Sequence, residues 1–341
     1  MSDQPTLTDG TVTLRPWTDA DVAAGVAGHD EEIAQWFGSE HASPTEAEQR
    51  DAIRRWRQGW EDGTTVNFLV EAEGAVVGNV EVRVKDDHIG ELSWTLYAGH
   101  RGRGYGVRAV RMLVDWAVDQ LGLVRIEAYV NTANERSKRL ATRAGLQREG
   151  VMRGREVLRG DRHDTVLFAR LASDPPITEP GGFRALLNSF LPRKRGISQL
   201  LVRDPADRVL LCQLTYKRDW DLPGGVVEVG ESPQRAVSRE VAEELALDLP
   251  AGRLLLTDWL PPWGGWDDAL CLVFDGGVHD PSLLDAVVKE TREIRAAEFC
   301  TMEQVVERCA DFTARRVAAA LANVHDGGPA YAESGRSPDT P

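Results

Sequence analysis

Cysteine is scarce in this sequence. Four cysteines occur in 341 residues, and all of them lie in the second half: Cys212, Cys271, Cys300 and Cys309. Their spacings match neither a zinc-binding pattern nor a redox-active pair. Because Cys212 and Cys271 stand within apolar runs typical of strands, we expect reduced core residues rather than disulfides or a metal site.

Basic residues and long apolar runs are also lacking. Lysine and arginine number 40 against 54 acidic residues, which gives a formal net charge of −14. This balance argues against a non-specific binder of nucleic acid or of a membrane surface, although it is compatible with a local basic groove. No apolar run approaches the roughly 20 residues that span a bilayer, and the N-terminal segment MSDQPTLTDG lacks the features of a signal peptide. We therefore expect a cytoplasmic protein without a membrane partner.

The length of the chain predicts two domains, because most domains contain about 100–200 residues. Residues 173–195 form a linker in which a Pro- and Gly-rich segment precedes a short amphipathic helix that could dock on either domain. We expect domains over residues 9–172 and 196–324, and a disordered tail over residues 325–341.

An acidic helix is predicted within residues 225–247. Ser232 and Pro233 are typical of an N-cap and of the first helical position, and apolar residues follow at helical spacing. Three carboxylates fall at i, i+3 and i+4 and share one helix face: Glu240, Glu243 and Glu244. Such a face either remains solvated or binds a hard divalent cation such as Mg²⁺ or Mn²⁺.

The residues around this helix resemble the Nudix box. They follow Leu222-Pro223-Gly224 and stand at the spacing of that family: Gly225, Glu231, Arg239, Glu240, Glu243 and Glu244. A chance match of six fixed residues is on the order of 10⁻⁷ per starting position. One position departs from the pattern, because Ala246 stands where the family usually has glycine.

The resemblance implies a Nudix α/β/α sandwich that hydrolyses a nucleoside diphosphate linked to another group. It assigns metal binding and catalysis to Glu240 and Glu244, with Glu243 as a third ligand, and it implies that Glu231 and Arg239 brace the loop against the helix. The catalytic base varies in the family, and further carboxylates are open candidates for it: Glu290, Glu293, Asp267 and Asp268. The two tryptophans of the loop over residues 260–268 could stack a base or simply pack.

A glycine-rich loop is the chemical feature of the first half. A predicted strand over residues 89–97 leads to this loop, and an amphipathic helix follows over residues 107–121. Glycines let backbone N–H groups approach an anion, and the helix directs its positive end toward that anion. We therefore predict a pyrophosphate cradle, with anion contacts from Arg101 and Arg103. A Rossmann-type dinucleotide site does not fit, because no acidic residue ends the next strand.

Arg101-x-x-Gly104-x-Gly106 resembles the acyl-CoA-binding motif of GNAT acetyltransferases. The order of the predicted elements over residues 9–172 is also similar to that family, in particular to its ribosomal-protein N-terminal acetyltransferase branch. The resemblance implies a mixed central sheet with flanking helices, and acetyl-CoA bound by the loop residues Arg101, Gly102, Arg103, Gly104, Tyr105 and Gly106.

The same resemblance assigns roles to the segment Asn134-x-x-Ser137. It implies that Asn134 holds the pantetheine arm and that Ser137 assists the leaving thiolate. Ala141 occupies the position at which many relatives carry a tyrosine as general acid. Glu91 is our candidate for the general base, and a solvated turn carboxylate is the alternative interpretation.

Together the motifs predict an α/β (α+β) protein of two domains and a bifunctional enzyme, an N-acetyltransferase joined to a Nudix hydrolase. The alternative hypothesis is that one module is inactive and acts as a ligand-binding sensor that regulates the other. The expected partners are a nucleotide substrate and an amine acceptor, which could be a protein N-terminus, a small metabolite or an antibiotic. Nucleic acid is not expected as a partner. Hydrolysis of CoA itself is not favoured, because residues 217–223 lack the further motif of CoA pyrophosphatases.

Overall fold

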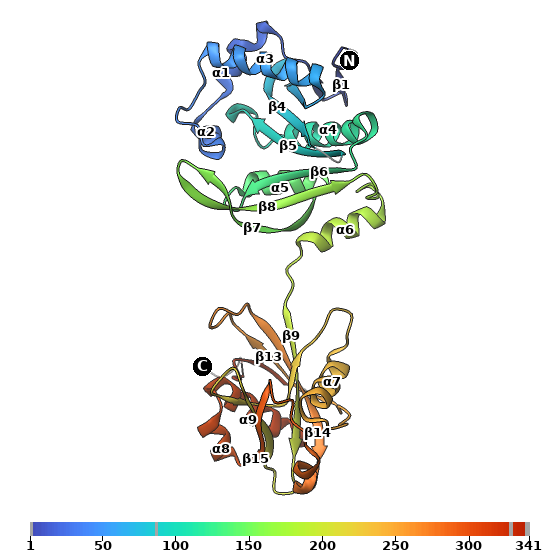
Figure 1. The fold of residues 1–341 in the computed structure, drawn as a ribbon, viewed down its shortest axis with the longest axis vertical. Coiled ribbons are helices and arrows are strands. Elements are labelled where there is room, and N and C mark those ends of the chain that lie inside the picture. The colour runs from blue at the N-terminus through green and yellow to red at the C-terminus, as the bar shows by residue number, and fades with distance from the viewer. Residues whose placement is uncertain (1–2, 86–87, 327–329, 338–341) are drawn as a thin grey trace. The chain divides into compact units, whose positions relative to one another are not determined.

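The structure is a computed structural model that describes residues 3–85, 88–326 and 330–337 (Figure 1). The chain divides into two compact units, residues 1–191 and 192–341. Each unit contains its own mixed sheet and its own helices, and each is described here by itself. No helix in the described ranges is long and apolar enough to cross a membrane.

The first unit is organised around a sheet in which the described residues form eight strands, in the order β1-β2-β3-β4-β5-β6-β8-β7. Neighbouring strands are antiparallel except for β5 and β6, which are parallel. The strand bounds are β1 Leu7–Thr8, β2 Val12–Arg15, β3 Thr65–Ala72, β4 Ala75–Val84, β5 Ile89–Leu96, β6 Arg125–Asn131, β7 Gln147–Leu158 and β8 Asp161–Leu171.

Helices cover both faces of this sheet. Alternation along β3 shows this directly, because Phe68 and Val70 belong to the core under α4 whereas Leu69 packs with Ile53 of α3. The helices and 3₁₀ turns are η1 Asp19–Asp21, α1 Val22–Gly28, α2 Glu31–Phe37, α3 Glu46–Asp62, η3 Ala98–His100, α4 Tyr105–Leu121, α5 Glu135–Ala144 and α6 Pro180–Phe190.

The short helix α6 of the predicted linker belongs to the first unit. It contacts β7, and the hydroxyl of Ser189 accepts a hydrogen bond from the backbone N–H of Arg148 at 3.0 Å. The sequence left open the domain on which this helix docks, because an amphipathic stripe shows only that one face is covered.

The second unit is an α/β/α sandwich. Residues of β9 alternate between two apolar cores, so that Leu200 packs toward α7 while Leu201 packs toward α9. Within the described residues the main strand order is β11-β10-β9-β14-β13-β16, with β12 paired to β9 and β15 paired to β10. The bounds are β9 Arg195–Arg203, β10 Val209–Leu214, β11 Trp220–Asp221, β12 Gly224–Val226, α7 Pro233–Leu245, β13 Leu254–Leu260, β14 Ala269–Val278, η4 Pro281–Ala286, β15 Ile294–Cys300, α8 Met302–Arg308, α9 Asp311–Asp326 and β16 Ala330–Glu333.

The prediction of a disordered tail over residues 325–341 is wrong for residues 325–326, which end α9, and for residues 330–337. Here β16 pairs in parallel with β13, Ala332 is buried, and the N–H of Gly335 donates to Asp258 at 2.8 Å. The edge of β13 offers unpaired backbone groups, and a short segment with an apolar residue facing the core satisfies them. The remainder of the predicted tail, residues 327–329 and 338–341, lies outside the described residues.

Candidate active sites

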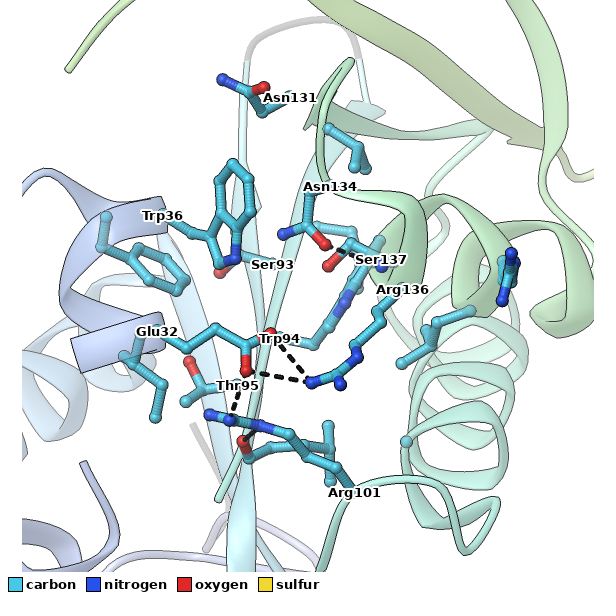
Figure 2. A pocket seen from close by; sticks show the side chains of 18 of the residues that line it. Glu32, Trp36, Ser93, Trp94, Thr95, Arg101, Asn131, Asn134, Arg136 and Ser137 are labelled. Atoms are coloured by element: carbon cyan, nitrogen blue, oxygen red, sulfur yellow. Dashed lines mark hydrogen bonds and ion pairs between the residues drawn. The ribbon is translucent and has the colours of Figure 1, made fainter. Parts of the chain in front are cut away.

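A cleft opens in the first unit because its two parallel strands diverge. β5 and β6 pair only where Ile89–Glu91 lies beside Arg125–Glu127, and beyond this point β5 stays with β4 while β6 stays with β8. The resulting cavity has a volume of about 860 Å³ and lies against α2, α5 and the start of α4 (Figure 2). The fold therefore brings the glycine-rich loop, the Asn134–Ser137 segment and Glu91 to one cavity, as their predicted roles require.

The glycine-rich loop ends in an uncapped helix start at this cavity. Gly102 and Gly104 have φ of +80° and +85°, values that glycine adopts without strain. Gly104 is the N-cap of α4, and no side chain among the described residues caps it. The first backbone N–H groups of α4 are therefore left for an anion, and the helix dipole favours one there.

The arginines of the loop are placed differently from the prediction. The guanidinium of Arg101 forms ion pairs with Asp30 at 2.8 Å and with Glu32 at 2.7 Å, and its Nε donates to the carbonyl of Leu96. Arg103 is exposed and pairs with Glu73 at 3.3 Å. Because two carboxylates already compensate Arg101, this side chain fixes the loop against α2, and the backbone amides remain for the anion.

Asn134 and Ser137 lie together at the start of α5. The side-chain oxygen of Asn134 accepts a hydrogen bond from the Ser137 N–H at 3.0 Å, so Asn134 is the N-cap of this helix. Both residues line the cavity (Figure 2). Ala141 is fully buried in the core, and its methyl group cannot act as the acid that a tyrosine would supply.

Three carboxylates line the same cavity, and they differ in their partners. Burial alone would raise the pKa of Glu91, but the ion pairs with Arg83 and Lys85 outweigh it and lower the pKa, which makes Glu91 a weak base. Glu32 is paired with Arg101 and Arg136. Glu156 on β7 has no ion-pair partner among the described residues. The sequence interpretation missed it, because it lies on an exposed strand far from any motif.

The box glutamates of the second unit form a partly buried acidic site on α7. Glu244 is buried, and its carboxylate accepts a hydrogen bond from the Gly224 N–H at 3.2 Å. Burial raises the pKa of Glu244 to about 8, and the charges of Glu240, Glu293 and Asp221 add to this increase against that hydrogen bond. Several carboxylates thus share one region of low polarity.

Glu240 lies directly beneath Gly225. A Cβ atom at residue 225 would lie 2.5 Å from the Glu240 carboxyl carbon, so a larger residue there would displace the Glu240 carboxylate from its present position. Arg239 donates to both carboxylate oxygens of Glu231 at 3.0 Å and also pairs with Glu240 at 3.0 Å, an arrangement that can serve as the predicted brace. The brace fixes both the loop and the first box glutamate.

Glu243 is expected as a third metal ligand from the helix spacing, but its side chain points to solvent, whereas Glu293 lies close enough to affect the box glutamates. The Glu243 side chain is 60% exposed and forms an ion pair with Arg239 at 2.9 Å. Burial raises the pKa of Glu240 and Glu244, and the charge of Glu293, which precedes β15, adds to both increases, while Glu243 adds to that of Glu240. Of the other open candidates, Asp268 pairs with Lys194, and Glu290 accepts from the Arg292 N–H.

This acidic site fits a hard divalent cation. The described residues contain no group of three or more His, Cys, Asp or Glu side chains already gathered around a metal position. Burial raises the pKa of both Glu240 and Glu244, and neighbouring carboxylates add to both increases although Arg239 pairs with Glu240, so a cation would relieve the repulsion at this site. Carboxylate oxygens are the ligands that Mg²⁺ and Mn²⁺ prefer.

The two tryptophans of the loop stand at the tip of the β13–β14 hairpin. Gly264 and Gly265 have φ of +58° and +88°, and this turn places Trp263 opposite Trp266. The side chains of the two tryptophans are 62% and 59% exposed. Trp263 packs edge-to-face against Phe312 with the ring centroids 5.6 Å apart, and the Arg195 guanidinium lies 4.7 Å from the centroid of the Trp266 ring. The loop is therefore partly packed, and the remaining aromatic surface is exposed.

Comparison with known proteins follows the division into two units. Residues 11–147 match the acetyltransferase (GNAT) domain, and residues 192–321 match the NUDIX domain. The uncharacterized N-acetyltransferase p20 of Bacillus licheniformis is 31% identical over 107 residues, which span 31% of this chain and 60% of that protein. The probable N-acetyltransferase YjcK of Bacillus subtilis (strain 168) is 28% identical over 176 residues, which span 48% of this chain and 96% of that protein.

Among solved structures, a ribosomal-protein-S5-alanine acetyltransferase from Vibrio fischeri is 21% identical, covers 51% of this chain and 100% of that chain, and has a TM-score of 0.46. A similarity of this size carries no functional argument. The two family matches carry the assignment, and they agree with the loop and cleft of the first unit and with the braced glutamates of the second. This chain therefore joins a GNAT acetyltransferase domain to a NUDIX domain, and both domains indicate enzymatic activity.

Proposed function

We propose that the chain is a bifunctional enzyme. Its first unit transfers an acetyl group from acetyl-CoA to an amine, and its second unit is a Mg²⁺- or Mn²⁺-dependent hydrolase of a nucleoside diphosphate linked to another group. The observation that carries the proposal is the cleft of the first unit, which contains both an uncapped helix start and an unpaired carboxylate. The acceptor is a protein N-terminus or a small molecule.

In the acetyltransferase, the amides at the start of α4 bind the pyrophosphate of acetyl-CoA, and the gap between β5 and β6 receives its pantetheine arm. The amine nitrogen attacks the thioester carbon, the C–N bond forms and the C–S bond breaks. Glu156 accepts the proton that the amine loses, directly or through water, because it is the cleft carboxylate without a cationic partner. Ser137, which lines the same cleft, donates a proton to the leaving thiolate.

In the hydrolase, Glu240 and Glu244 would hold the cation, with Glu293 as a further carboxylate of the acidic site. The bound cation would neutralise pyrophosphate charge and lower the pKa of a water molecule. Arg239 and Glu231 keep the loop and helix in register, and Gly225 provides the space for Glu240. Water attacks a phosphorus atom and a P–O bond of the pyrophosphate breaks. The exposed Trp263 and Trp266 supply a surface on which a nucleobase stacks.

Two assays on the full chain test this proposal. Each assay compares a variant of the proposed catalytic carboxylate with the same substitution at a nearby carboxylate. Thiol release from acetyl-CoA is measured over a panel of amines, and phosphate release is measured over nucleoside diphosphate derivatives with Mg²⁺. We expect Glu156→Gln to reduce acetyl transfer about 100-fold and to leave hydrolysis unchanged. The matched variant Glu91→Gln should have a much smaller effect, because Glu91 is already held by Arg83 and Lys85.

For the hydrolase, Glu244→Gln should abolish phosphate release and leave acetyl transfer unchanged. Glu243→Gln is the matched control, because it makes the same change at the neighbouring residue. This variant should keep most of the activity, since Glu243 is exposed and pairs with Arg239. Acetyl-CoA binding without transfer to any amine would identify the first unit as a sensor. Nucleotide binding without turnover would do the same for the second unit.

A further inference from the structure

The short helix α2 borders the cleft of the first unit and has few buried contacts of its own. It supplies Ile33, Trp36 and Phe37 to the cavity wall, and Figure 2 shows the Trp36 indole N–H directed toward Ser93 of β5. Only Ile33 and Ala34 of this helix are buried. A helix of this length is marginal by itself, and an element with little buried surface opens at low cost in free energy. Contacts at the two ends of α2 therefore decide where it lies.

The N-terminal end of α2 is tied to both halves of the cleft. Asp30, the N-cap of α2, and Glu32 form ion pairs with Arg101 of the glycine-rich loop, which follows β5. Glu32 also pairs with Arg136 of α5 at 3.0 Å, and Figure 2 shows the Glu32 carboxylate between the two guanidinium groups. Because α5 follows β6, the pair between Glu32 and Arg136 bridges the gap between the diverging strands β5 and β6.

The C-terminal end of α2 is tied to the tip of the β7–β8 hairpin (Figure 1). Arg159 and Gly160 form a two-residue turn at this tip, with φ of +51° and +91°. The Arg159 guanidinium donates a hydrogen bond to the carbonyl of Ser39 at 2.9 Å. Gly38, the C-cap of α2, lies against Leu158, since a Cβ atom at residue 38 would be 3.3 Å from Leu158 Cδ2. A second bridge therefore joins α2 to the β6–β8 half of the cleft.

The hairpin that holds α2 also carries the carboxylate proposed as the base. Glu156 and Leu158 both line the cavity from β7, and the contact with α2 lies next to them. While both bridges hold, an amine must therefore pass α2 to reach Glu156. One hydrogen bond and one exposed ion pair are weak enough to break and re-form during turnover.

We propose that α2 is a lid on the acceptor side of the cleft and that its two bridges limit the bulk of the amine that enters. This inference rests on the acetyltransferase activity proposed above. With both bridges formed, a slender amine reaches Glu156, whereas an amine with a bulky chain end enters only after the lid opens. Arg159 is a positioning residue for α2, because its own side chain does not line the cavity.

Two amines with the same number of carbons test the lid on the full chain with acetyl-CoA: n-hexylamine and 3,3-dimethylbutylamine. Both are primary amines with unbranched carbon next to the nitrogen, so their intrinsic reactivity toward a thioester is similar, and they differ in the bulk of the chain end. We expect kcat/KM for n-hexylamine to exceed that for 3,3-dimethylbutylamine at least about 10-fold. Equal values would overturn the proposal.

Variants of the hairpin bridge locate this selectivity. Arg159→Ala removes the hydrogen bond to Ser39 and should raise kcat/KM for 3,3-dimethylbutylamine about 3–10-fold, while kcat/KM for n-hexylamine and the KM of acetyl-CoA stay unchanged. Arg159→Lys keeps a donor at the tip and should restore the wild-type ratio. Arg153→Ala is the matched control, because Arg153 is exposed on the same hairpin and does not line the cavity. An unchanged ratio in Arg159→Ala would contradict the lid.

Hydrogen–deuterium exchange separates the lid from the activity on which it rests. The backbone amides of α2 should exchange about 3–10-fold faster in Arg159→Ala than in the wild type, and at the wild-type rate in Arg153→Ala. Faster exchange without acetyl transfer to either amine would contradict the proposed activity and support the lid. Unchanged exchange in Arg159→Ala would overturn the lid, whatever the rates of acetyl transfer.

Discussion

Replacement of Ala246 by glycine should stabilise the second unit. Ala246 is the C-cap of α7 and has φ +57° and ψ +27°, in the left-handed region, while its N–H donates to the carbonyl of Ala242 at 3.0 Å. A left-handed conformation costs a non-glycine residue about 1–2 kcal/mol. Glycine loses about 0.5–1 kcal/mol more backbone entropy on folding. The difference predicts a net gain of about 0.5–1 kcal/mol in the free energy of unfolding.

Thermal unfolding of the full chain measures this gain. For units of about 150 residues, 1 kcal/mol corresponds to roughly 2–4 °C in Tm, so the Ala246→Gly variant should melt roughly 1–4 °C higher. Ala242→Gly is the matched control, because Ala242 is exposed in the same helix and adopts the ordinary helical conformation. That substitution should lower the same transition by about 1 kcal/mol, which also identifies the transition as that of the second unit.

The opposite signs of the two substitutions make the test strict. If Ala246→Gly lowers the melting temperature as Ala242→Gly does, the entropy of glycine dominates and the strain argument fails. If neither variant moves the transition, α7 does not limit the stability of this unit. A rise for Ala246→Gly beside a fall for Ala242→Gly would confirm that Ala246 carries backbone strain that glycine relieves.

Three further substitutions or deletions have defined outcomes. The hydrogen bond from Arg15 lowers the pKa of Asp21 from 3.8 to about 2, so the Asp21 carboxylate adds about 2 kcal/mol to the free energy of unfolding above pH 4, and this contribution is lost as the pH falls through 2. Denaturant titrations at several pH values should show that Asp21→Asn flattens the pH dependence of stability. An unchanged slope would contradict the ion pair. Gly224→Ala should cost at least about 2 kcal/mol by chemical denaturation, because its Cβ would lie 2.2 Å from the carbonyl oxygen of Ser198 at a φ of +136°; wild-type stability would refute the close approach. Deletion of residues 330–341 removes β16 and should lower the unfolding free energy of the second unit by about 2 kcal/mol, whereas an unchanged melting curve would show that the tail pairing adds nothing.

The sequence by itself determined the features that depend on local geometry. Ser232 and Pro233 begin α7 as predicted, and the bidentate pair between Arg239 and Glu231 joins two residues of one motif. The glycine-rich loop likewise precedes α4 as its composition indicates, since positive φ at Gly104 is a property of the local backbone. Caps, helical periodicity and glycine conformations act over a few residues, and the sequence displays them directly.

The tertiary structure alone decided which groups within those motifs are free to act. Arg101 is compensated by Asp30 and Glu32, about 70 positions away in the chain, so the predicted anion contact passes to the backbone. Glu243 shares the helix face of Glu240 and Glu244, yet its side chain is exposed and paired with Arg239. Burial raises the pKa of both Glu240 and Glu244, and the charge of Glu293, from a distant segment, adds to both increases. Ion pairing and burial depend on distant segments that meet only in the folded chain, and no spacing along the sequence records them.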